Sequence, residues 1–132
     1  MQHVLTIICD DIRLELGQKI SLMGIYDEAI VFKRVPARIA KLCMLQRWDG
    51  SDQPEKVRIQ IRGSALSGTF SAEGKRQRDH LNPDVKRARV TFAFAPFDVV
   101  DVGEVEFLTY FGDTEQPAYS HRIEIRVDPN ME

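Results

Sequence analysis

Within residues 7–28, apolar and polar residues alternate on both arms of a stretch centred on Gly17, at residues 12–15 and 19–22. A period of two is typical of β-strands with one buried face, and a glycine between two such arms is typical of a hairpin turn. An antiparallel pairing centred on this glycine puts apolar beside apolar and acid beside base, in the pairs Leu14–Ile20, Ile12–Leu22 and Glu15–Lys19. The pattern therefore predicts a β-hairpin here.

The first arm of this hairpin changes character at two consecutive acids. Residues 3–9 are apolar on both parities, as in a strand covered on both faces, whereas only even positions stay apolar beyond Asp10 and Asp11. We expect a β-bulge at this point. One acid falls on the inward parity and requires a partner, for which Arg13, Arg47 or a backbone amide would serve. We interpret both acids as structural residues that fix the strand break.

Residues 37–48 are compatible with two kinds of element. They contain good helix formers and follow Pro36, a residue suited to the first turn of a helix. On a helical wheel, however, Met44 and Trp48 lie opposite the other apolar residues, so no single apolar stripe forms. A strand buried on both faces explains apolar residues on both sides, and strand is the interpretation we favour.

The remaining chain shows further alternating segments separated by turn-forming residues. Residues 56–62 alternate most cleanly, residues 69–73 indicate a further short strand, and residues 88–95, 104–111 and 119–127 repeat the period of two, the last two as a second hairpin. Residues 49–55 and 75–84 are predicted loops, and residues 97–102 cross an end of the fold or form an edge strand.

These segments predict an all-β, antiparallel β-sandwich of about eight or nine strands, immunoglobulin-like or C2-like in architecture, with a barrel as the alternative. The 132 residues form a single domain in this interpretation, since no linker or internal repeat divides them.

Composition narrows the partners and the compartment. A net charge of −2 gives no global field of the kind that recruits nucleic acid or acidic membranes. No apolar run reaches the roughly 18 residues of a spanning helix, and the first residues lack a signal-peptide pattern, so a cytoplasmic protein is expected. Cys9 and Cys43 are expected to be buried free thiols.

Candidate chemistry is sparse. The two carboxylates after Cys9 disfavour a reactive thiolate, and the three histidines have no metal-type spacing, so no catalytic residue, metal or cofactor is predicted. The residues best suited to a ligand site are Asp10, Asp11 and Trp48, with Tyr26 or Tyr110 as further aromatic groups of a cleft.

Charge is segregated along the chain. Residues 75–89 carry six basic residues against two acids, a local balance of 6 − 2 = +4, whereas residues 90–121 carry six acids and no Lys or Arg. Opposite patches of this kind steer association with a charged partner. The candidate interaction residues are Lys75, Arg76, Arg78, Lys86, Arg87 and Arg89. Because aromatic residues are not interleaved with these cations, nucleic acid is not an expected partner.

The stretches ICDDIRLELGQKISLMGIYDE and VPARIAKLCMLQRW resemble the opening of a family of small uncharacterised bacterial proteins, a domain of unknown function. The resemblance covers about the first third of the chain, implies a bacterial cytosolic β-sandwich and carries no catalytic residues with it.

Two classes of function follow from the residues. The favoured hypothesis is a non-enzymatic protein-interaction or structural module that self-associates, as a homodimer, or binds another protein through an exposed sheet edge or the charge patches. The alternative is a small-molecule or carbohydrate-binding domain, including one that hydrolyses its ligand.

Overall fold

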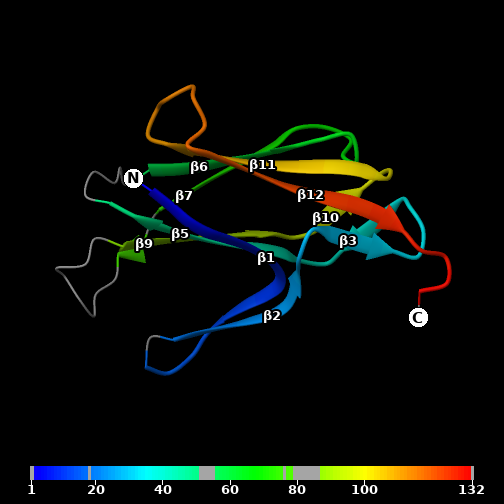
Figure 1. The fold of residues 1–132 in the computed structure, drawn as a ribbon, viewed down its shortest axis with the longest axis horizontal. Helices are drawn as coiled ribbons and strands as arrows, with labels where there is room; N and C mark the ends of the chain where they lie inside the picture. Colours follow the sequence, from blue (N-terminus) through cyan, green and yellow to red (C-terminus); the bar gives the residue numbers. More distant parts are fainter. Residues whose placement is uncertain (1, 18, 51–55, 76, 79–86, 132) are drawn as a thin grey trace.

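Two five-stranded sheets pack face to face in the computed structural model, which describes residues 2–17, 19–50, 56–75, 77–78 and 87–131 (Figure 1). The first sheet has the strand order β2-β1-β5-β9-β8 and the second β3-β12-β11-β6-β7, while β10 and β4 form a separate pair. The first sheet comprises β1 (Gln2–Leu14), β2 (Ile20–Tyr26), β5 (Leu42–Asp49), β8 (Gln77–Arg78) and β9 (Arg87–Phe94). The second comprises β3 (Ala29–Phe32), β6 (Lys56–Arg62), β7 (Phe70–Lys75), β11 (Gly103–Phe111) and β12 (Tyr119–Val127), and the pair is β4 (Ala37–Ile39) with β10 (Phe97–Val99).

The predicted all-β sandwich is confirmed, with two differences. The described part of the chain has twelve strands rather than eight or nine, because β3, β4, β8 and β10 are each four residues long or shorter. The pairing between β3 and β12 is parallel, whereas the other strand pairs are antiparallel.

The core lies between the sheets and follows the period of two. Val57, Ile59 and Ile61 of β6 are fully buried, as the alternation predicted, and Phe107 of β11 is buried beside them. Each such side chain contributes about 1.5–3 kcal/mol when it leaves water. The short pair β4–β10 adds Phe97 to the same core.

Residues 37–48 form strands β4 and β5, which confirms the preferred interpretation over a helix. Strand β5 is the centre of its sheet, between β1 and β9. Its residues from Leu42 to Gln46 are buried at both parities. Burial on both faces is the reason that the segment has no single apolar stripe.

Both predicted hairpins form, and the first has the predicted register. Its observed pairs include Ile12–Leu22 and Leu14–Ile20, and the Glu15 amide donates to the Lys19 carbonyl at 2.8 Å. The bulge expected at Asp10 and Asp11 was wrong, since the β1–β2 pairs keep one frame there. The register shift of β1 occurs earlier, between His3 and Leu5, against β5.

At Asp10, strand β1 instead separates from β5. The β1–β5 pairs end at Cys9–Cys43, and from there to Leu14 the strand pairs only with β2. Figure 1 shows the resulting two-stranded arm, in blue, bending away from the two layers.

The two predicted loops are only partly described. The short strand β8 (Gln77–Arg78) falls inside the loop predicted for residues 75–84, and residues 76 and 79–84 lie outside the described part. In the loop predicted for 49–55, Asp49 ends β5 and residues 51–55 lie outside the described part.

Candidate functional site

The most exposed apolar surface of the described chain lies on the β1–β2 arm. Leu14 and Leu16 near its tip are 77% and 93% exposed, and Met23 and Ile25 on β2 are 46% and 56% exposed. Among the described strands, β2 pairs only with β1 and therefore forms an edge of its sheet. The arm thus presents a free strand edge with apolar side chains beside it.

Asp10 lies at the base of this arm and accepts a hydrogen bond from the Tyr26 hydroxyl. Between them, Gly24 adopts a left-handed conformation with φ of 68°, and a Cβ at this position would overlap the Asp10 carboxylate. Burial and the neighbouring carboxylate together raise the pKa of the Tyr26 hydroxyl. The Asp10 carboxylate is therefore fixed by the hydroxyl of Tyr26, and it occupies the space that a side chain at position 24 would fill.

Asp11 points to the other face and binds two cations. Its carboxylate accepts hydrogen bonds from the Lys41 ammonium at 2.7 Å and the Arg13 guanidinium at 3.1 Å. Lys41 and Arg13 lower the pKa of the Asp11 carboxyl group. Arg13 was predicted as a partner of the inward acid, but it pairs with Asp11, while Asp10 on the inward parity bonds Tyr26 instead. Lys41 ties the arm to the segment just before β5.

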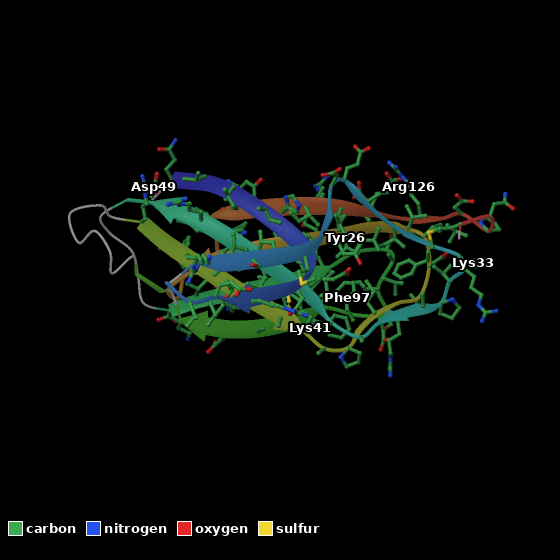
Figure 2. All side chains as sticks on the ribbon, turned by 90° about the horizontal axis from the view of Figure 1, so that it is seen from below. Tyr26, Lys33, Lys41, Asp49, Phe97 and Arg126 are labelled. Atoms are coloured by element: carbon green, nitrogen blue, oxygen red, sulfur yellow. The ribbon has the colours of Figure 1, made fainter. Side chains whose placement is uncertain are left out.

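A groove of about 340 Å³ lies between the arm and the outer face of β5 and β9. Its apolar walls come from both sides, and two cations lie on it, with the residues Ile12, Leu14, Ile20, Lys41, Cys43, Arg89, Thr91, Phe92 and Ala93 forming the lining. Seen from below in Figure 2, the arm crosses this face of the sheet, with Tyr26 and Lys41 labelled there. The volume is at the small end of the range for ligand pockets.

Trp48 does not share this site. It is 2% exposed and pairs in register with His3, seven residues along β1 from Asp10, which corresponds to about 23 Å along a strand. Figure 2 shows the neighbouring Asp49 at the far end of the molecule from Tyr26 and Lys41. The structure therefore does not bring Trp48 together with the two acids.

Trp48 belongs instead to a buried polar network around Gln46. The indole N–H of Trp48 and the Thr109 hydroxyl donate to Gln46 Oε1 at 3.1 and 3.0 Å, and Gln46 Nε2 donates to the Thr6 hydroxyl at 3.2 Å. A further hydrogen bond of 2.7 Å joins this hydroxyl to His3. The network connects both sheets and satisfies the polar groups of Gln46, which is fully buried.

The aromatic alternative Tyr110 lies elsewhere. Its ring is on β11, 4.5 Å below the Arg58 guanidinium, and its hydroxyl donates to Gln60 at 3.2 Å. The described pockets lined by Tyr110 and by the arm share no residue. Of the predicted aromatic groups, Tyr26 meets Asp10, whereas Trp48 and Tyr110 bond to Gln46 and Gln60 in other parts of the described chain. The groove beside the arm is lined by neither of the two acids.

The predicted charge patches are only partly described. Arg87 and Arg89 lie on β9, and Arg89 lines the groove. The backbones of Lys75 and Arg78 lie in strands, whereas Arg76 and Lys86 fall outside the described residues. Three of the six acids of residues 90–121 are paired with basic residues from other strands, in Arg38–Asp98, Lys56–Asp113, Arg62–Glu106 and Arg122–Glu106.

The thiols are free and buried, as predicted. Cys9 and Cys43 lie opposite each other on β1 and β5, and burial raises the pKa of the Cys9 thiol to about 11. In the described chain no group of three or more His, Cys, Asp or Glu side chains is placed to hold a metal ion. The part of the chain that is described also contains no helix long and apolar enough to cross a membrane.

Sequence reasoning missed Lys41, Gly24 and Gln46. A glycine within an otherwise apolar strand is a signal for a close approach, so Gly24 could have been found from its position opposite Asp10 in the predicted register. The sequence offered no comparable signal for Lys41, whose partner lies 30 positions away.

Comparison with models of known protein families finds no match, and comparison with curated proteins finds no relative. The resemblance of the opening stretch to a bacterial domain of unknown function stays a prediction.

Proposed function

We propose that the protein is a non-enzymatic interaction module that binds a protein partner through the free edge of β2. The observation that carries this proposal is the composition of the edge. The strand ISLMGIY has no charged residue and no proline from Ile20 to Tyr26, and Met23 and Ile25 are exposed beside it.

Free sheet edges in soluble proteins are normally protected. Charged residues, prolines, short strands or a covering element prevent another chain from pairing with the unpaired amides and carbonyls. The other edges of this sandwich follow the rule. Strand β7 carries Glu73, which lies 3.5 Å from the Lys56 ammonium, and β3 and β8 are four and two residues long. Strand β2 is longer and carries none of these charges, which fits an edge that receives a partner.

An added strand would use the outward-facing amides of β2. Because the Glu15 amide donates to the Lys19 carbonyl, the hydrogen-bonded pairs of the β1–β2 ladder fall on the odd residues of β2. The amides and carbonyls of even residues such as Leu22 then point to the free edge. Strand addition of this kind takes its affinity from main-chain hydrogen bonds and its specificity from alternate side chains.

The test is a proline at Leu22. Leu22→Pro removes an outward amide and keeps the amides that pair with β1, so it should abolish partner binding while the unfolding midpoint shifts only slightly. Leu22→Ala is the matched control, because it loses the side chain and keeps the amide. Light scattering at low and high salt, together with affinity capture from the source organism, measures association. A strict monomer at both salt concentrations, with no captured protein that Leu22→Pro loses, would contradict the proposal.

The groove supports a second candidate, a small-molecule binder for an amphipathic anion. Its apolar walls lie beside the cations of Lys41 and Arg89. Ala93→Trp on β9 fills this groove and leaves the β2 edge intact. A ligand at 100 times its dissociation constant stabilises a protein by about 2.7 kcal/mol. A thermal shift with medium-chain fatty acids that Ala93→Trp removes and Leu22→Pro retains would favour this candidate.

A further inference from the structure

We infer that the partner of the β2 edge is a second copy of this chain, paired antiparallel through β2 with Met23 on the two-fold axis. This inference rests on the proposed function and specifies its partner. An antiparallel pair of identical strands is isologous, so every contact occurs twice and the assembly closes as a dimer.

The hydrogen-bond phase of β2 restricts the registers. Since its even residues face the edge, they must pair with even residues of the second copy. A register centred on Met23 satisfies this condition by placing Leu22 opposite Gly24 and Ile20 opposite Tyr26. Met23 then faces itself in a non-hydrogen-bonded pair, where side chains come closest.

Charge complementarity selects this register over its neighbours. Lys19 and Asp27 flank the uncharged strand, both are exposed, and neither forms an ion pair within the described residues. Lys19 and Asp27 lie one residue outside the two ends of β2, and a ladder centred on Met23 that continues to them places Lys19 of each copy opposite Asp27 of the other. A shift of two residues in either direction puts Lys19 opposite Ile25 or Ala29 instead. The two ends of the strand are therefore complementary in this register.

The two exposed apolar side chains of β2 lie on one face of the arm. Met23 and Ile25 pair with Asp11 and Cys9, which are two residues apart on β1, so the two copies would bring four apolar side chains together around the axis. Pairing would thus cover apolar surface that the single chain leaves in water.

A charge exchange tests the register. Lys19→Glu and Asp27→Lys should each weaken self-association roughly tenfold or more, because two symmetry-related contacts become repulsive at once. A mixture of the two variants should associate again as a heterodimer. In that heterodimer the glutamate introduced at position 19 meets the lysine introduced at position 27, and the unchanged Asp27 of one copy meets the unchanged Lys19 of the other. Sedimentation velocity on each variant and on the mixture measures this. If the wild type dimerises but the single variants associate equally well, the register is overturned.

A cysteine at the axis gives an independent measurement. The Cα atoms of a non-hydrogen-bonded antiparallel pair are about 4.5 Å apart, within disulfide range, so oxidised Met23→Cys should form a covalent dimer. Ser21→Cys is the matched control, because Ser21 faces Ile25 of the second copy. It should cross-link poorly alone and readily with Ile25→Cys. The native thiols are buried and do not compete. Equal cross-linking of Met23→Cys and Ser21→Cys, or none in either, overturns the inference.

The failure of this inference is distinguishable from failure of the proposed function. A monomeric wild type without a Met23→Cys dimer rules out self-pairing. If such a monomer still captures a different protein that Leu22→Pro loses and Leu22→Ala keeps, the edge remains the binding site and only its partner is changed. If nothing is captured either, both are wrong.

Discussion

The two hairpins of this chain have the same period of two and opposite places in the fold. In the β11–β12 hairpin, one face carries Phe107 into the core, and the other holds Glu106 between Arg62 and Arg122 at 2.9 Å from each. In the β1–β2 hairpin, the part beyond Cys9 leaves the sandwich, and its side chains near the tip are largely exposed. One hairpin is covered on its apolar face by the opposite sheet, and the other is open along an edge.

An apolar strand face therefore does not by itself indicate a core. The β11–β12 hairpin lies in the middle of its sheet, with β6 on one side and β3 on the other, and the opposite sheet covers its inner face. The β1–β2 arm continues past the last pair with β5. Beyond Cys9, β1 therefore pairs with no described strand other than β2. An apolar surface left in this way is available to a partner.

The largest expected effect separates the hairpins by stability. Phe107→Ala removes a fully buried ring and should lower the free energy of unfolding by about 3–5 kcal/mol. Leu16→Ala, at the tip of the β1–β2 arm, should change it by less than about 0.5 kcal/mol, because that side chain is already in water. Urea denaturation of both variants provides the measurement. Similar losses in the two would mean that the arm is packed in solution.

A smaller effect should arise at the base of the arm. Gly24→Ala forces a side chain into a left-handed conformation and into the Asp10 carboxylate, so we expect a loss of about 2–3 kcal/mol. Gly17→Ala has a similar positive φ and no atom within 4 Å of the new Cβ, so only the conformational cost of about 1–2 kcal/mol applies. Thermal unfolding of both variants compares them. If Gly17→Ala lowers the free energy of unfolding as much as Gly24→Ala does, the overlap with the Asp10 carboxylate does not contribute to the loss at position 24.

The smallest effect is the acid dependence of the β11–β12 ion pairs. Arg122, followed by Arg62, lowers the pKa of the Glu106 carboxyl group against the opposing effect of burial. Because the folded-state pKa lies below the unfolded one, this stabilisation is complete above the unfolded value and is lost as the pH falls through the folded value. Between about pH 5 and about pH 3, wild type should lose stability more steeply than Glu106→Gln.

Urea denaturation across this pH range measures the difference in slope. Glu124→Gln is the control, since Glu124 pairs with Arg126 on its own strand and is about half exposed, where an ion pair adds little. Parallel pH profiles for wild type and Glu106→Gln would show that the two arginines do not stabilise the fold through this carboxylate.

Much of the fold could be predicted because its rules are local. Alternation located the longer strands, the centre at Gly17 gave the Ile12–Leu22 and Leu14–Ile20 pairs, and the lack of a helical stripe identified residues 37–48 as strand. Less of the candidate site could be predicted. Trp48 attracted attention as a large aromatic residue, but its neighbours in the sheet bury it against Gln46.

The sequence alone was enough to locate the longer strands, the apolar side of each, and the opposite charges at the two ends of β2, but not the two-residue strand β8, which lies in a predicted loop. Only the tertiary structure decided what covers each apolar side, because a period of two records the faces of a strand and not its neighbours. The order of strands in the sheet brings Arg62 and Arg122 to Glu106 and leaves β2 without a second neighbour among the described strands. These are contacts between distant segments, which no local pattern encodes.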